Sequence, residues 1–207
     1  MFFLSAFLLC IVLNLNTLRI PLFYGNVKIH FSKNIIILFS ILTSIGTLFF
    51  MYAGKLLLNL FNPKIGNIFG AICLSFIGVY YIVEYIRLEN KQAGYDTSYY
   101  SETSFKYKNF TEYPYAINLD RTNSISLTKC FEFSIAFILN NFFIYFSAGI
   151  TGININLSIF FNFVFTLLTL YLGYLNFNAN IIRFFYRFLN LISGSILIIL
   201  GLYEVFI

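Results

Sequence analysis

Charged residues are scarce in this sequence, and so are the residue patterns of enzyme sites. Asp, Glu, Lys and Arg make up 10% of the 207 residues, against about 25% in a typical soluble domain. There is one histidine, and the sequence contains no Ser-His-Asp set, no H-x-x-x-H pattern and no phosphate-binding glycine loop. These absences argue against a soluble domain, and we expect neither an enzyme nor a bound cofactor.

Cysteine pairs and basic stripes are also missing. Cys10, Cys73 and Cys130 are odd in number and lack C-x-x-C spacing, so we interpret them as small buried hydrophobes and expect no metal site. The thirteen Lys and Arg fall singly between apolar runs, which argues against nucleic acid as a partner. The N-terminus has no basic leader and no A-x-A cleavage site, so we expect a retained first helix.

Long apolar runs dominate what is present. Hydrophobic residues are 59% of the chain, and its mean hydropathy is +0.82. Because a spanning helix needs about 20 mostly apolar residues, the sequence predicts an all-α polytopic membrane protein whose main partner is the lipid bilayer. Six windows qualify as transmembrane helices: 2–23, 35–54, 66–87, 130–151, 155–175 and 184–206.

A long polar connection divides the six predicted helices into two sets of three. The segment 89–129 mixes both signs of charge with many tyrosines and has no apolar periodicity, which indicates a solvated loop. The expected organisation is a three-helix repeat over 1–88, this hydrophilic loop, and a second repeat over 130–207. Most Lys and Arg fall in the odd-numbered loops, so the positive-inside rule places the long loop in the cytoplasm and both termini outside.

Short matches at nearly constant offsets relate the two halves. The offsets are 124, 119 and 123 residues in the first, second and third helices. Since each half has three helices, the second half enters the membrane from the opposite side, which is the inverted-repeat plan of many transporters. The matched pairs are Leu15-Asn16 with Leu139-Asn140, Tyr52-Ala53-Gly54 with Tyr171-Leu172-Gly173, and Gly78-Val79-Tyr80 with Gly201-Leu202-Tyr203.

Two longer motifs carry a family resemblance. The run 118–126, NLDRTNSIS, leads into the helix start 136–142, AFILNNF, and the first half offers Asn14-Leu15-Asn16-Thr17. In these motifs, and in its six predicted helices with a central loop, the chain resembles the YtaF-like sporulation membrane proteins. These are a branch of the MntP-like manganese efflux family. The resemblance implies a bacterial cell-membrane location, a role in spore formation and a cation path between the halves.

The departures from that family fall on its charged positions. By the resemblance, an intramembrane aspartate of each half becomes Asn16 and Asn140. We therefore predict a degenerate transport site formed by Asn14, Asn16, Asn140 and Asn141. Arg19 adds a positive charge in the first span that either reaches the membrane surface or repels cations.

Three functions remain open from the sequence. The first is a YtaF-like protein with lost or altered cation pumping. The second is Mn²⁺ efflux, although a dehydrated dication favours carboxylate ligands that Asn does not supply. The third is export of a small solute, which a neutral amide site tolerates. Interhelical hydrogen bonding alone also accounts for buried Asn residues.

Overall fold

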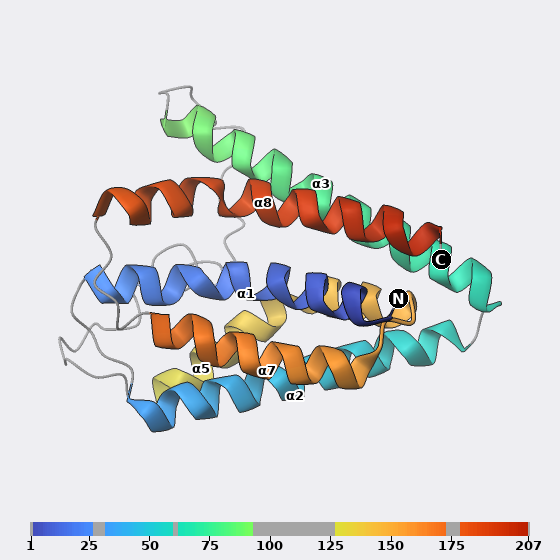
Figure 1. The fold of residues 1–207 in the computed structure, drawn as a ribbon, viewed down its shortest axis with the longest axis horizontal. Helices are drawn as coiled ribbons and strands as arrows, with labels where there is room; N and C mark the ends of the chain where they lie inside the picture. The colour runs from blue at the N-terminus through green and yellow to red at the C-terminus, as the bar shows by residue number, and fades with distance from the viewer. Residues whose placement is uncertain (1, 27–31, 60–61, 93–126, 173–178, 207) are drawn as a thin grey trace.

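The chain folds into a bundle of long helices. A computed structural model describes residues 2–26, 32–59, 62–92, 127–172 and 179–206, and most of these residues belong to helices (Figure 1). The predicted loop 89–129 lies outside the described residues apart from its two ends. The helices are α1 (Phe2–Asn26), α2 (Lys33–Leu58), α3 (Pro63–Gln92), α5 (Leu127–Asn140), α6 (Phe142–Ile150), α7 (Ile155–Leu172) and α8 (Ala179–Val205).

The first three helices pack mainly on the last four. The largest interface joins α3 to α8, which lie side by side in Figure 1. Helix α1 packs on α7 and α8, while α2 packs on α5, α6 and α7. The described parts of the two halves are therefore interleaved, and contacts between neighbouring helices of one half are few.

Helix α2 shows why this bundle belongs in a membrane. One of its faces consists of exposed apolar side chains, including Ile41, Ile45 and Leu48, whereas its buried face carries hydroxyls. A helix in water has the opposite pattern, because there the apolar stripe faces the core. With lipid as solvent, the hydroxyls gain partners inside the bundle and the apolar face meets acyl chains.

Four described helices are long and apolar enough to cross a bilayer: Lys33–Leu58, Lys64–Arg87, Ile155–Leu172 and Phe188–Val205. A fifth span results if the bent pair α5 and α6 is counted as one. The chain is thus a helical, multi-span membrane protein, as predicted. The remaining predicted span, 2–23, coincides with α1, whose apolar stretch Phe3–Leu15 is shorter, so six spans remain a prediction.

The predicted span 130–151 is not one straight helix. It divides at Asn141 into α5 and α6, whose axes differ by 49°. Asn141 has φ −95° and ψ 3° and begins α6 without a side-chain cap. The bend directs α6 toward α2, where Gly54 faces the Phe146 carbonyl and Gly149 faces Met51. At these two glycines the backbones are too close for a β-carbon.

The α3–α8 interface contains a pair of similar close contacts. A β-carbon on Gly78 would lie 2.7 Å from the Gly194 carbonyl oxygen, and one on Gly194 would lie 2.6 Å from the Gly78 carbonyl oxygen. Farther along, a β-carbon on Gly201 would lie 2.6 Å from the Ala71 carbonyl oxygen. Small residues at these crossings let two long helices touch backbone to backbone.

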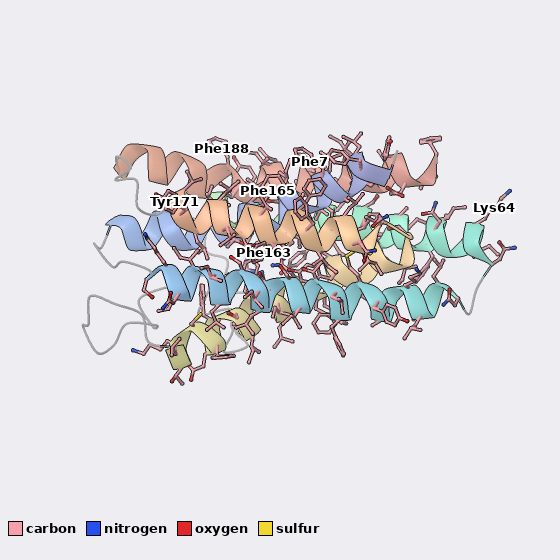
Figure 2. The ribbon with its side chains drawn as sticks, turned by 60° about the horizontal axis from the view of Figure 1, so that its bottom comes forward. Phe7, Lys64, Phe163, Phe165, Tyr171 and Phe188 are labelled. Atoms are coloured by element: carbon pink, nitrogen blue, oxygen red, sulfur yellow. The ribbon has the colours of Figure 1, made fainter. Side chains whose placement is uncertain are left out.

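Aromatic and aliphatic side chains fill the remaining space. Phe7 of α1 meets Phe165 of α7 edge to face, with ring centroids 5.5 Å apart (Figure 2). One apolar cluster lies between α2, α5 and α7, and a larger one joins α1, α2, α3, α6 and α8. A turn with Gly152 at φ +77° connects α6 to α7, and left-handed glycine at this position is typical of a helix C-terminus.

Candidate functional site

Four polar side chains form a connected set near the middle of the bundle. We call Asn14 of α1, Thr47 of α2, and Asn162 and Thr166 of α7 the amide–hydroxyl network. The Thr166 hydroxyl donates to Asn14 Oδ1 at 2.9 Å, and Asn14 Nδ2 donates to Asn162 Oδ1 at 3.1 Å. Asn162 Nδ2 donates to Thr47 Oγ1 at 3.0 Å. The network thus ties three helices from both halves together by side chains that are at most 3% exposed.

The Asn14 amide is held by one further bond. Asn14 Nδ2 also donates to the Cys10 carbonyl at 2.9 Å, one turn earlier on α1. The Cys10 thiol in turn reaches the Ser158 carbonyl of α7 at 3.2 Å. Because both hydrogens and the oxygen of the Asn14 amide are engaged, its orientation is fixed by its neighbours.

The hydroxyls of α2 present acceptors to the bundle interior. Ser40, Thr43, Ser44 and Thr47 are buried, and each donates to a carbonyl three or four residues earlier at 2.8 to 3.1 Å. A hydroxyl bonded back to its own helix has used its hydrogen and keeps its lone pairs. Thr47 therefore meets Asn162 as an acceptor, and the row extends this acceptor surface along α2.

Tyr145 of α6 adds an unpartnered polar atom to this region. Its side chain is fully buried, and its hydroxyl lies near Thr47 and Cys10. That hydroxyl has no hydrogen-bond partner among the residues that the structure describes. Thr47, beside it, already bonds to the Thr43 carbonyl and to Asn162, so the Tyr145 hydroxyl keeps the capacity for a further hydrogen bond.

The network carries no formal charge. Within the described ranges, Glu204 is the one charged side chain that is buried, and it lies near the end of α8 beside Ser5. Ser5 precedes Asn14 by nine residues on α1, a distance of about 13 Å along a helix. No group of three or more His, Cys, Asp or Glu side chains gathers anywhere in the described part of the chain.

The predicted site residues separate in the structure. Asn14 belongs to the network, whereas Asn141 is buried at the α5–α6 break and donates to the Phe137 carbonyl at 3.2 Å. Asn140, the last residue of α5, is half-buried. Asn16 and Arg19 lie on α1, and their side chains are outside the described part of the structure. No hydrogen bond in the described residues joins Asn14 to Asn140.

Sequence reasoning missed Thr47, Asn162, Thr166 and Tyr145. Thr47 and Thr166 are 119 residues apart, the same offset that relates Tyr52 to Tyr171. A second signal was the row of polar residues at four-residue spacing in α7, formed by Ser158, Asn162 and Thr166. Such a row places small polar groups on one helix face.

Chemically, the network can exchange hydrogen bonds with a neutral guest. It offers amide and hydroxyl oxygens and N–H donors, but no carboxylate to balance a dication. Comparison with known proteins yields no match to a family model, to a curated protein or to a solved structure. Inferences about function therefore depend on the chain's own residues.

Proposed function

We propose that this protein is a membrane transporter built from two inverted three-helix repeats, and that it carries a small solute of no net charge. The amide–hydroxyl network carries the proposal. In transporters built from inverted repeats, the substrate site lies between the repeats near the middle of the membrane. Here Asn14 and Thr47 come from the first half and Asn162 and Thr166 from the second.

The packing of the helices supports the repeat. In the predicted repeat, α1 is equivalent to the bent pair α5 and α6, α2 is equivalent to α7, and α3 is equivalent to α8. If equivalent helices are exchanged, the same set of main interfaces results. The α1–α7 interface corresponds to α2 with α5 and α6, and α1–α8 corresponds to α3–α6. The interfaces α2–α7 and α3–α8 correspond to themselves. This correspondence is expected of a two-fold axis between the halves.

Individual close contacts fit the same exchange. At the 123-residue offset of the third helices, Gly78 corresponds to Gly201 and Ala71 corresponds to Gly194. The contact of Gly78 with Gly194 therefore corresponds to the contact of Gly201 with Ala71. These two contacts lie at different places on the α3–α8 interface, so their correspondence is one observation in favour of a two-fold relation.

The uncharged site favours a neutral cargo over Mn²⁺. Stripping water from a dication inside the bundle needs opposing charge. The nearest described buried carboxyl, Glu204, is about 13 Å away along α1 by helix rise. A solute with hydroxyl or amide groups instead replaces one hydrogen bond by another, and the Tyr145 hydroxyl near Thr47 gains a partner.

The family resemblance supplies the cellular part of the proposal. By that resemblance, the chain is a divergent MntP-like, YtaF-like protein of the bacterial cell membrane that acts in spore formation. This part is tested separately, by deleting the gene in its host and counting heat-resistant spores. A count equal to that of the parent strain would remove the sporulation role and leave the transport proposal intact.

Flux into vesicles tests the transport proposal. Purified protein is reconstituted, and uptake of radiolabelled serine, glycerol and Mn²⁺ is compared with uptake by empty vesicles. We expect flux of a neutral solute, reduced in Asn162→Leu and retained in Thr169→Val, because the half-buried Thr169 hydroxyl donates to the Thr166 carbonyl of its own helix. Flux of Mn²⁺ alone would establish manganese efflux instead. Flux of none of the probes would favour a protein that has lost pumping.

A further inference from the structure

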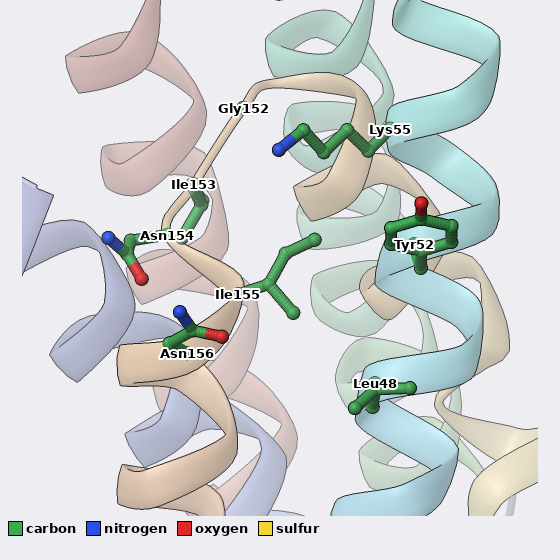
Figure 3. A pocket seen from close by; sticks show the side chains of 8 residues that line it. All are labelled: Leu48, Tyr52, Lys55, Gly152, Ile153, Asn154, Ile155 and Asn156. Atoms are coloured by element: carbon green, nitrogen blue, oxygen red, sulfur yellow. The ribbon is translucent and has the colours of Figure 1, made fainter.

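A second feature, independent of the transport proposal, is a cavity of about 600 Å³ between α2 and the start of α7 (Figure 3). We call it the lateral pocket. The α6–α7 turn covers one end of it, and Lys55 extends from α2 toward that turn. Its lining residues are Leu48, Tyr52, Lys55, Gly152, Ile153, Asn154, Ile155 and Asn156.

The polar end of the lateral pocket is rich in donors and has no acid. Lys55 is exposed and makes no ion pair with any residue that the structure describes. Tyr52, Asn154 and Asn156 complete the polar lining. Asn154 Oδ1 accepts from the Leu157 N–H at 3.1 Å, and this amide points away from α2, so Asn156 supplies the side-chain amide on the pocket side (Figure 3). This lining suits an anion.

The other end of the lateral pocket is apolar and open to lipid. Leu48 is 49% exposed and Tyr52 is 55% exposed, and both belong to the outer face of α2. Leu48 precedes Lys55 by seven residues, so it lies about 10 Å deeper along the helix. In Figure 3, Ile155 points across the pocket toward α2. A guest therefore meets a cation at one end and aliphatic side chains at the other.

The depth of the lateral pocket matches a lipid headgroup. Lys55 lies in the last turn of α2 and Asn156 in the first turn of α7, so both are at the boundary of the spans. By the predicted topology this end of α2 faces the outside, where the Lys55 ammonium attracts the anionic headgroup of an outer-leaflet lipid by charge, and the positive end of α7 acts in the same sense.

We propose that the lateral pocket binds one anionic phospholipid. Its phosphate is held by Lys55, the Tyr52 hydroxyl and the Asn156 amide, and an acyl chain runs along Leu48 and Ile155. A free phosphate ion would leave the apolar half of the pocket empty, and a zwitterionic lipid would bring its own cation to Lys55. The favoured ligand is therefore an anionic headgroup attached to acyl chains.

Native mass spectrometry of the full chain tests this proposal. The protein is titrated with phosphatidylglycerol, with phosphatidylcholine of the same acyl chains, and with inorganic phosphate. We expect one phosphatidylglycerol to bind more tightly than phosphatidylcholine. Lys55→Gln should weaken its binding by about fivefold, the factor expected for one lysine at an anionic surface. Lys64→Gln is the matched control, because Lys64 projects from the first turn of α3 outside the pocket (Figure 2).

Each alternative outcome overturns the site. Equal binding of the two lipids would remove the preference for an anion. Equal weakening by Lys55→Gln and Lys64→Gln would indicate general surface charge and no defined pocket. Inorganic phosphate that displaces phosphatidylglycerol at equal concentration would make the ligand a free anion. If Lys55→Gln protein cannot be purified, Tyr52→Phe, which removes one exposed hydroxyl, should still weaken the phosphatidylglycerol complex.

Discussion

Replacing Thr166 by valine isolates one bond of the amide–hydroxyl network. The substitution keeps the shape of the side chain and removes only the hydroxyl that donates to Asn14 Oδ1 at 2.9 Å. Asn14 keeps its own donor bonds to Cys10 and Asn162. Its oxygen, however, loses the donor on α7 and remains 3% exposed, so water does not replace it.

The expected loss of stability follows from two known ranges. An interhelical hydrogen bond in a membrane protein contributes about 0.6 kcal/mol on average and about 1.7 at most. Leaving a buried acceptor unpaired adds a cost that reaches about 1–3 kcal/mol in soluble proteins. We therefore expect Thr166→Val to lower the free energy of unfolding by about 1–2 kcal/mol, which is about a 5- to 30-fold change in the equilibrium constant.

Thr169→Val is the matched control. Thr169 lies on the same helix, is half-buried, and donates only to the Thr166 carbonyl at 3.0 Å. We expect its loss to change stability by less than about 0.5 kcal/mol. The free energy of unfolding is measured in bicelles by steric trapping. Thr166→Val and Thr169→Val are each measured in the wild-type protein and in the Asn14→Leu variant. In the Asn14→Leu background, the cost of Thr166→Val should fall close to that of the control.

Two results would refute this reasoning. The first is an equal effect of Thr166→Val and Thr169→Val, which would mean that the bond between α1 and α7 adds no stability. The second is an undiminished effect of Thr166→Val in the Asn14→Leu background, because the hydroxyl would then act through another partner. Either result would also weaken the transport proposal, which depends on these helices meeting at the network.

Two further predictions concern packing and topology. Gly78→Ala should lower the free energy of unfolding by about 1–3 kcal/mol, because the added methyl group meets the Gly194 backbone. Gly66→Ala is the control, since a methyl group there meets the end of the Leu58 side chain. A Gly66→Ala variant as unstable as Gly78→Ala would contradict this prediction. For topology, cysteines are placed at Ser32 and Asn59, the two caps of α2. They should react with an impermeant maleimide from opposite sides of the membrane, with position 59 outside. Labelling of both positions from one side would exclude α2 as a transmembrane span.

The helical spans could be predicted because the bilayer imposes their length. The windows 35–54 and 155–175 correspond closely to α2 and α7, since any apolar run of this length has one low-energy form in lipid. The division at Asn141 could not be read from its neighbours in sequence. It accompanies the approach of α6 to α2 at Gly54 and Gly149, a contact between residues far apart in the chain.

The network was only partly predictable for a related reason. Asn14 is conspicuous as an amide in an apolar run, but threonine is common in membrane helices, where its hydroxyl bonds to its own backbone. The Thr47 hydroxyl donates to the Thr43 carbonyl of its own helix, whereas the Thr166 hydroxyl donates to Asn14 on another helix. Only the packing of α7 against α1 and α2 distinguishes the two.

The interleaving of the two halves has a consequence for how the protein is made. When Thr47 is synthesised, its partner Asn162 is still 115 residues away, a wait of roughly 6–23 s at ordinary elongation rates. During that time the hydroxyl row from Ser40 to Thr47 has no α7 to face. Each hydroxyl of the row can then bond only to its own helix, and the contacts between α2 and α7 form once the last helices arrive and close the bundle.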